Sequence, residues 1–282
     1  MLCTDMDRTV IPNGEQSEHP LARQSFAAFC SQPQVVPVYV TGRHQKLVQE
    51  AIKLYSLPQP DFAITDVGSK IYQVQQNHWQ PLQAWEDEID KDWNGKNHDD
   101  LKQLFNDLSE LHLQEFSRQN MHKLSYYISP HVKLEKLITS MRNRLDQLGV
   151  HASLVSSIDE PRGIGLLDVL PRNATKLHAI EFLRLQLGFP LQEVVFGGDS
   201  GNDMHVLVSP IPAVLVANAT SEVKTAVLKQ VQYHGNQAAL YLAAGDNNNM
   251  NGNYSAGVLE GVGHFMPHFR EQLRQAGFCY DE

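Results

Sequence analysis

The sequence predicts an α/β protein, with a doubly wound parallel-sheet (Rossmann-like) core and an inserted α+β cap domain. Dense β-branched runs without alternation, such as VVPVYV at residues 35–40, are typical of parallel strands buried on both faces. Segments with helical periodicity, such as residues 44–55, separate these runs. In the middle of the chain, KLSYYIS at residues 123–129 alternates instead, as half-buried strands do. A parallel sheet interrupted by a small second sheet accounts for all three observations.

The first eighty residues predict a β-α-β-α-β unit. A short apolar strand precedes Asp5, and KIYQV from Lys70 follows a turn at Val67-Gly68. The elements between them are a helix over residues 21–30, a strand over 35–40, a helix over 44–55 and a strand over 61–65.

The composition changes after this unit. Residues 75–100 are polar and rich in Asn, Gln, Asp and Trp, and they predict a crossing linker with an exposed surface. The cap elements follow as a helix over 101–113, a strand over 123–129, a helix over 131–148, and strands over 151–157 and 165–170. Core elements then resume as a helix over 175–187 and strands over 193–197 and 213–217. We therefore place the core domain at 1–80 and 166–282 and the cap domain at 81–165.

Composition limits the classes of partner. The 282 residues carry a formal net charge of −9, which disfavours nucleic acid, because phosphate backbones are bound by surplus Lys and Arg. The thiols Cys3, Cys30 and Cys279 show no paired or metal-ligand spacing, as expected in a reducing compartment. The sequence shows no basic-then-apolar leader and no apolar run of about 20 residues. We therefore expect a cytoplasmic protein without membrane contact.

Two carboxylates stand at the end of the first strand. Asp5 and Asp7 are two residues apart, so in an extended chain both side chains point to the same side. Because reactions gather at the carboxyl ends of parallel strands, the pair is a candidate catalytic site. Taken alone, it is equally typical of a turn with solvated aspartates.

Other segments carry matching chemistry. The strand over 35–40 ends in Thr41-Gly42-Arg43, which offers a hydroxyl donor and a glycine where backbone N–H groups can approach an anion. The strand over 193–197 runs into a Gly-rich turn bearing Asp199 and Asp203. Lys176 lies near the start of a helix and supplies a positive charge. Converging carboxylate oxygens indicate magnesium, and the whole set is what phosphoryl transfer requires.

These residues also carry a family resemblance. DMDRT at 5–9, VTGR at 40–43, Lys176 and GGDSGND at 197–203 resemble the four ordered motifs of the haloacid dehalogenase superfamily of phosphatases. Within it the chain is similar to the sucrose-phosphate phosphatases, in residues 41–72, in HKLSYYIS, in LLDVLPRNATK at 166–176 and in SAGVLEGVGHF near the end.

The resemblance implies a magnesium-dependent phosphatase that hydrolyses a sugar phosphate, sucrose 6-phosphate before others, through a phospho-aspartate. Asp5 would be the nucleophile and Asp7 the acid and base. The magnesium set would be Asp5, Asp7 through its backbone carbonyl, Asp199, and Asp203 directly or through water. The substrate set would be Thr41, Gly42, Arg43, Lys176 and Asn202 for the phosphate, with Lys123 and Asp168 for the glucosyl unit. A sugar-phosphate synthase of the same pathway is the expected protein partner.

Two positions depart from the family pattern. Arg8 replaces a smaller residue in the first motif, and Lys70 stands where an acidic residue is common. A lysine cannot accept hydrogen bonds from sugar hydroxyls, so Lys70 bears on the choice of sugar. For the mechanism, Asp5 must stay ionised, which magnesium and Lys176 favour. Asp7 must be able to carry a proton near neutral pH, which needs partial burial beside a negative phosphate.

Several alternatives remain open at this stage. A phosphorylated mannosyl-fructose or glycosyl-glycerol is an alternative substrate, and a sugar phosphomutase is an alternative activity. A signalling receiver module also gathers acidic residues, Thr and Lys around magnesium, but it needs only about 120 residues in one doubly wound unit. A non-enzymatic sugar-binding protein would account for Trp79, Trp85 and Trp93 but not for the acidic cluster, and such tryptophans are more often packing residues.

Overall fold

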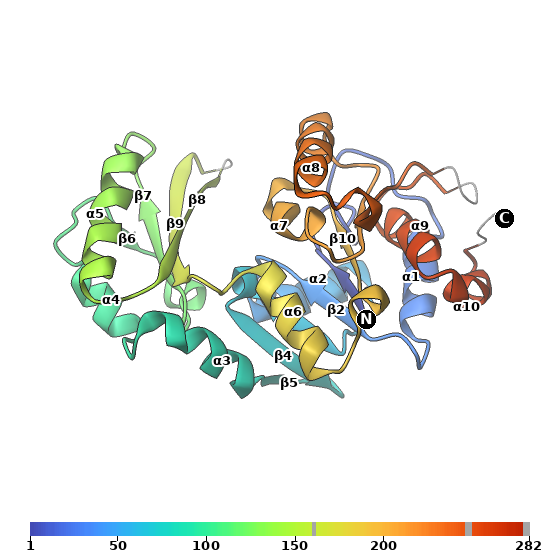
Figure 1. The fold of residues 1–282 in the computed structure, drawn as a ribbon, viewed down its shortest axis with the longest axis horizontal. Helices are drawn as coiled ribbons and strands as arrows, with labels where there is room; N and C mark the ends of the chain where they lie inside the picture. The colour runs from blue at the N-terminus through green and yellow to red at the C-terminus, as the bar shows by residue number, and fades with distance from the viewer. Residues whose placement is uncertain (160–161, 246–249, 279–282) are drawn as a thin grey trace. The chain divides into compact units, whose positions relative to one another are not determined.

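The computed structural model describes residues 1–159, 162–245 and 250–278. The chain forms two compact units, which we call the core unit (Met1–Pro81 with Lys176–Glu282) and the inserted unit (Leu82–Thr175) (Figure 1). The second segment of the core begins later than the predicted residue 166. Strand β9 (Ile164–Pro171) pairs over its full length with strands of the inserted unit, so residues 166–171 do not belong to the core.

The described part of the core unit contains a mixed, mostly parallel sheet of eight strands. Its order is β12 (Leu240–Leu242), β11 (Ala213–Leu215), β10 (Val195–Gly198), β1 (Leu2–Thr4), β2 (Pro37–Val40), β3 (Phe62–Thr65), β4 (Lys70–Gln75) and β5 (His78–Pro81). The first six strands in this order are parallel, and β4 and β5 are antiparallel. The chain winds outward from β1 in both directions, which confirms the doubly wound prediction.

The strands of this sheet are buried on both sides because helices cover both of its faces. Alternate strand residues such as Leu2 and Tyr39 join one apolar cluster. Among the described helices, α1 (Ala22–Cys30), α2 (Gln45–Tyr55), α9 (Ser255–Phe265) and α10 (Arg270–Gln275) contribute to it. Their strand neighbours Cys3 and Val40 are equally buried and point to the opposite face. The buried side chains of α6 (Lys176–Gln186) and α7 (Met204–Leu207) are not part of that cluster, and α6 contacts β3.

The inserted unit is an antiparallel sheet with helices on one face. Its strand order is β6 (His112–Leu113), β7 (Leu124–Ile128), β9 and β8 (Ala152–Asp159). Tyr126 and Leu167 point to the face that packs against α4 (His98–Leu104) and α5 (Leu134–Gln147). Ser125 and Asp168 point to the other face, as the period of two requires.

The prediction for residues 75–100 was wrong. This segment contains β5, α3 (Gln83–Asp90) and the beginning of α4 rather than an exposed linker. Trp85 and Trp93 have no exposed surface, and Trp79 is 8% exposed. Most of the polar residues lie on the outer sides of elements whose inner sides carry the indoles, but Glu86 and Asp92 are buried. Composition alone was therefore misleading. The tryptophans are packing residues, as expected.

The helix predicted over 101–113 is also shorter and begins earlier. Asn97 caps α4, since Asn97 Oδ1 accepts from Asp100 N and Asp100 Oδ2 accepts from Asn97 N, both at 3.0 Å. After Phe105 the chain continues in turns, and residues 112–113 join the sheet as β6. The Asn97 capping box therefore sets where this helix starts.

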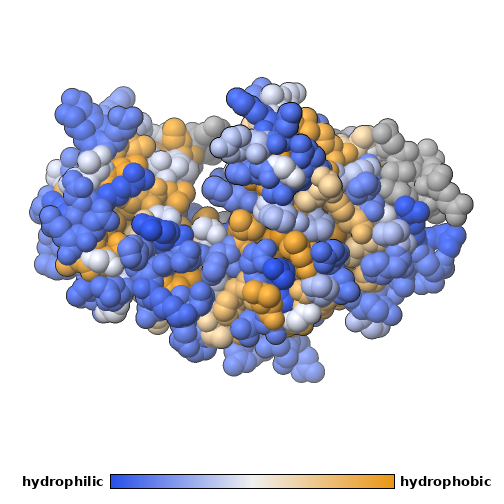
Figure 2. All heavy atoms as spheres, viewed as in Figure 1, coloured by the Kyte–Doolittle hydropathy of each residue, from blue (hydrophilic) through white to orange (hydrophobic). Residues whose placement is uncertain are grey.

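Burial elsewhere follows polarity. Hydrophilic side chains cover most of the face seen in Figure 2. Cys3 and Cys30 are free and buried, whereas Cys279 lies outside the described residues. Within the described part of the chain, no helix combines the length and apolarity that crossing a membrane requires.

Candidate active site

Neighbouring parallel strands bring the predicted site segments to one edge of the main sheet. Asp5 follows β1, Thr41 follows β2 and Asp199 follows β10, and these three strands lie side by side in the sheet. The ladder continues one residue past the strand ends, since Asp5 N donates to Gly197 O at 2.8 Å. Lys176 begins α6. The positions that the sequence singled out in the core are therefore set by rigid elements.

Three buried carboxylates cluster at this edge, and two of them share one ammonium group. One oxygen from each of Asp5, Asp199 and Asp203 lies within 4.8 Å of the other two. Lys176 Nζ donates to Asp5 Oδ1 at 2.9 Å and to Asp203 Oδ1 at 2.8 Å. All four side chains are less than 10% exposed, so these charges interact with little screening by water.

Asp203 also holds the turn that carries Asp199. Its Oδ2 accepts from Asp199 N and Ser200 N, each at 3.2 Å. A Cβ at Gly198 would lie 2.8 Å from Asp203 Oδ2, so only glycine allows this close approach. Both oxygens of Asp203 thus have protein partners, and its first role is to shape the turn.

Arg8 is the partner of Asp199 that the sequence analysis did not find. Arg8 Nε lies 3.3 Å from Asp199 Oδ2, and Thr9 Oγ1 lies 3.4 Å from Asp199 Oδ1. The Arg8 backbone has φ 58°, which is costly for a residue with a Cβ. Asn218 holds it there, since Asn218 Nδ2 donates to Arg8 O at 2.6 Å. The unusual residue in the first motif was the signal for this contact.

Asp7 bonds to a different set of partners from the buried cluster. Arg43 donates to both Asp7 oxygens at 2.7 Å, and Asn13 Nδ2 donates to Oδ1 at 2.7 Å. The Asp7 side chain is 40% exposed. The two aspartates of the first motif therefore lie in different environments, Asp5 in the interior and Asp7 at the surface.

These environments shift the pKa values of the two aspartates in opposite directions. Burial raises the pKa of Asp5 to about 7, and the Asp203 carboxylate adds to the rise against the charge of Lys176. Burial also acts on Asp7, but hydrogen bonds and charge from Arg43 outweigh it and hold its pKa below the ordinary value. In the protein without substrate, Arg43 therefore stabilises the ionised form of Asp7, and the expectation that Asp7 can carry a proton beside a bound phosphate stays a prediction.

The surplus negative charge of the cluster fits a divalent cation. Burial raises the pKa of Asp199 to about 6, with a further rise from the charge of Asp203 that Arg8 opposes. Burial disfavours the charged form of Lys176, yet Asp5 and Asp203 outweigh it and raise its pKa. Magnesium prefers such hard carboxylate oxygens. The residues present are thus suited to hold the metal.

A left-handed turn after β3 supports the segment 41–43. Asp66 and Val67 have φ values of 52° and 63°, a strained conformation for a β-branched residue. Asp66 N donates to Arg43 O at 3.0 Å, and Val67 N donates to Thr41 O at 3.2 Å. This turn therefore fixes the backbone on both sides of Gly42, a contact that sequence reasoning missed.

The remaining predicted phosphate contacts lie near these groups. Thr41 is buried, and its Oγ1 accepts from Arg43 N at 3.2 Å. A Cβ at Gly42 would meet nothing closer than Val67 Cγ2 at 3.9 Å, so the fold leaves space above this peptide. Asn202 is exposed and lies in the 3₁₀ turn η5 (Gly201–Asp203).

The two predicted sugar contacts lie together in the inserted unit. Lys123 Nζ is 3.8 Å from Asp168 Oδ2, and Ser125 Oγ donates to Asp168 Oδ1 at 2.5 Å. Lys123 is 7% exposed, so this pair is partly withdrawn from water. The helix-free face of the sheet thus carries the charged pair that the sequence singled out there.

Comparison with known proteins connects this site to a family. The Sucrose-6F-phosphate phosphohydrolase family profile matches residues 1–266. The chain is similar to a putative HAD-like hydrolase of Nitrosococcus oceani, at 48% identity over 96% of this chain and 72% of that protein. It is also similar to sucrose-phosphatase 1 of Nicotiana tabacum, at 27% identity over 94% of this chain and 59% of that protein. The chain thus spans about three fifths of the tobacco protein.

A solved structure shows the same architecture. The sucrose-phosphatase of Synechocystis sp. PCC6803, in complex with sucrose and phosphate, superposes with a TM-score of 0.69 and 25% identity. The match covers 94% of this chain and 96% of that one.

Proposed function

The chain belongs to the sucrose-6F-phosphate phosphohydrolase family, and from this premise we propose that it hydrolyses sucrose 6-phosphate to sucrose and phosphate. Sugar-phosphate phosphatase is the activity of the fold and family, and the disaccharide is our proposal. The observation that carries the hydrolase proposal is the buried Asp5 at the end of β1, which shares Lys176 with Asp203 and lies beside Asp199.

Asp5 is proposed as the nucleophile. A carboxylate oxygen of Asp5 attacks phosphorus, the bond from phosphorus to the sugar oxygen breaks, and Asp7 gives a proton to the leaving oxygen. Water then attacks the phosphorus of phospho-Asp5 while Asp7 accepts its proton, which releases phosphate and restores both side chains. Lys176 opposes protonation of the attacking carboxylate and positions it through its 2.9 Å hydrogen bond.

Arg43 is proposed to control the proton on Asp7. In the structure Arg43 occupies both Asp7 oxygens, which favours the ionised form. Substrate phosphate oxygens are stronger bidentate partners for a guanidinium group, and they would draw Arg43 away. Asp7, next to the negative phosphate and without Arg43, would then bind the proton that the leaving sugar oxygen needs.

The acidic cluster also supplies the proposed ligands for magnesium. We propose that Asp5, Asp199 and the backbone carbonyl of Asp7 hold magnesium, while Asp203 acts through the turn that it shapes and through Lys176. Magnesium, when bound, neutralises the phosphate oxygens and orients them for in-line attack. Thr41, Gly42 and Asn202 are the proposed hydrogen-bond donors to the same oxygens.

Sugar selection is proposed to depend on Lys123 and Asp168. The relative that carries sucrose and phosphate supports a disaccharide ligand for the fold. A buried charged pair penalises a sugar that cannot pair with it by about 1–3 kcal/mol for each lost partner. Lys70 lacks acceptor capacity and would change which hydroxyls are selected. A sugar-phosphate synthase is the proposed supplier of the substrate.

The test is a phosphate-release screen with magnesium. The substrates are sucrose 6-phosphate, fructose 6-phosphate, glucose 6-phosphate and an aryl phosphate, with phosphorylated mannosyl-fructose and glycosyl-glycerol as alternatives. We expect kcat/KM for sucrose 6-phosphate to exceed that for either monosaccharide phosphate by at least about tenfold. Equal values across the screen would contradict disaccharide selection, and conversion to an isomeric sugar phosphate without phosphate release would indicate a mutase.

A further inference from the structure

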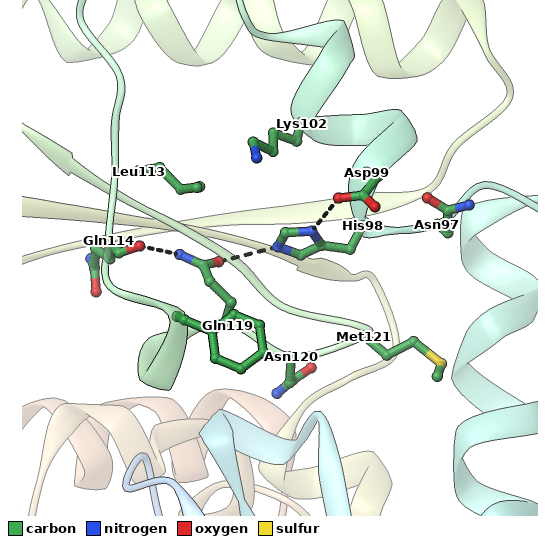
Figure 3. A pocket seen from close by; sticks show the side chains of 10 residues that line it. Asn97, His98, Asp99, Lys102, Leu113, Gln114, Gln119, Asn120 and Met121 are labelled. Atoms are coloured by element: carbon green, nitrogen blue, oxygen red, sulfur yellow. Dashed lines mark hydrogen bonds and ion pairs between the residues drawn. The ribbon is translucent and has the colours of Figure 1, made fainter.

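The inserted unit contains a cavity that none of the proposed catalytic, metal or sugar residues lines. It has a volume of about 540 Å³ and lies between α4, β6 and the 3₁₀ turn η3 (Phe116–Arg118) (Figure 3). This volume falls within the range of small-molecule sites. All its lining residues come from 97–121, so the inserted unit builds this cavity by itself.

Hydrogen bonds fix the polar wall of this cavity. Gln119 Nε2 donates to Gln114 O at 3.1 Å and to Ser125 O at 2.9 Å, while Gln119 Oε1 accepts from Ser125 N at 2.8 Å. These contacts define the orientation of the Gln119 amide, because the reversed amide would place its NH₂ group against a donor. The Gln119 side chain therefore has one defined orientation in the wall of the cavity.

The fixed amide determines the tautomer of His98. Gln119 Oε1 lies 3.3 Å from His98 Nε2, so Nε2 carries the hydrogen (Figure 3). The other ring nitrogen, Nδ1, lies 3.5 Å from Asp99 Oδ1. Beside the ring, the Asp99 carboxylate offers two acceptor oxygens. Two adjacent hydroxyl groups of a ligand are suited to donate to such a pair.

The rest of the lining combines amide groups with exposed apolar side chains. Asn97 and Asn120 contribute carboxamides to the wall. Phe116 lines the same cavity and is 93% exposed, and Met121 is 57% exposed. A large aromatic side chain left in water favours a ligand that covers it. A pyranose ring offers an apolar C–H face for the phenyl ring and hydroxyl groups for the amides and carboxylate.

From these observations we propose that the cavity lined by His98, Asp99 and Phe116 is a saccharide-binding subsite for a neutral sugar ring. Asp99 and Lys102 offset each other in formal charge, so an uncharged polyhydroxyl ligand fits better than an anion. The wall is continuous with the proposed sugar contacts, because Ser125 bonds to Gln119 and also to Asp168. The choice of a sugar rests on the proposed function, but the binding does not require the reaction.

Binding of unphosphorylated sucrose to the full-length protein in EDTA tests the proposal. Backbone amide NMR shifts would be followed up to about 50 mM sucrose, in the range of weak sugar sites. We expect saturable shifts at residues 97–121. Phe116→Ala should weaken binding about tenfold, and Asp99→Asn should weaken it several-fold. Both positions are exposed, so neither substitution opens the apolar core.

Tyr233→Ala provides the matched control. Tyr233 is an exposed aromatic residue on α8 (Ser221–His234), is 86% exposed and does not line the cavity. Its substitution should leave sucrose binding unchanged, and glycerol should cause no saturable shift. Unchanged affinity in Phe116→Ala, or shifts outside residues 97–121 alone, would overturn the subsite. Saturable binding here by a protein that hydrolyses no sugar phosphate would support the subsite and refute the proposed function instead.

Discussion

The core unit and the inserted unit recognise chemistry in different ways. In the core, four buried charged groups lie within contact of one another, and Arg8 adds a fifth charge at the rim. In the inserted unit, amides and an exposed phenyl ring line a cavity together with Asp99 and Lys102, and Lys123 pairs with Asp168. Concentrated charge suits a reaction centre for any phosphomonoester, whereas amides and aromatic surface discriminate among sugars. The proposed reaction and the proposed sugar selection thus lie in structures that can be perturbed separately.

The largest expected effect comes from Asp5→Asn, which should remove turnover in the core without changing the inserted unit. Activity on both sugar and aryl phosphates should fall by about five to six orders of magnitude, because no other carboxylate can form the phospho-enzyme. The substitution also relieves repulsion with Asp203, so thermal stability should not fall. Phosphate release and a melting curve measure both. Turnover close to that of the wild type would contradict the assignment of the nucleophile.

Removal of magnesium should give the next largest effect. Protein treated with EDTA should lose activity on every substrate and recover it on addition of magnesium, whereas calcium should inhibit. Magnesium at about 100 times its Kd should also add about 2.7 kcal/mol to the free energy of unfolding. Asp199→Asn should abolish this stabilisation. Full activity in EDTA would show that the acidic cluster serves another purpose.

Asp168→Ala should affect the inserted unit and leave the reaction centre of the core unit unchanged. We expect kcat/KM for sucrose 6-phosphate to fall by a factor equivalent to about 1–3 kcal/mol, since the Lys123–Asp168 ion pair is lost, while aryl phosphate hydrolysis stays unchanged. Asp107→Ala is the matched control, because Asp107 forms an exposed ion pair with Arg144 in the same unit. Equal losses on sugar and aryl substrates would show that Asp168 affects folding rather than sugar selection.

The smallest effect concerns pH and stability without metal. The native pKa values of Asp5 and Asp199, about 7 and about 6, lie above their ordinary value of 3.8. The folded state therefore retains protons that the unfolded chain has released, and the free energy of unfolding falls as pH rises from about 4 to about 7. Urea unfolding in EDTA measures this slope. Magnesium and Asp5→Asn should each flatten it, and a slope that neither changes would place its origin elsewhere.

The core chemistry was predictable because parallel strands bring distant motifs to one edge. Asp5, Thr41, Asp199 and Lys176 come from four separate segments, yet each stands at the end of a strand or the start of a helix in the sequence. The pairing of Asp7 with Arg43 was not predictable. It depends on the tertiary positions of two loops, and it lowers the pKa of Asp7 in the protein without substrate.

The inserted unit was less predictable because its apolar spacing is ambiguous. Phe105, Leu108 and Leu111 recur every three residues, which favoured a long helix. The structure satisfies the same spacing with successive turns, in which Leu108 N donates to Phe105 O and Leu111 N donates to Leu108 O. These turns lead into β6 and lie beside the cavity, so the error fell on the segment where the proposed sugar subsite lies.

The register of β1 has a consequence for synthesis on the ribosome. Leu2 pairs with Pro37 on one side and with Val195 on the other. The central strand β1 therefore has β2 on one side but no neighbour on the other until β10 has been made. At about 5–20 residues per second, this wait lasts about ten to thirty seconds. The inserted unit, with its own apolar cluster, is completed during that interval. A nascent chain that stalls before Val195 therefore carries the whole inserted unit and an open sheet edge, the form in which chaperones would meet it.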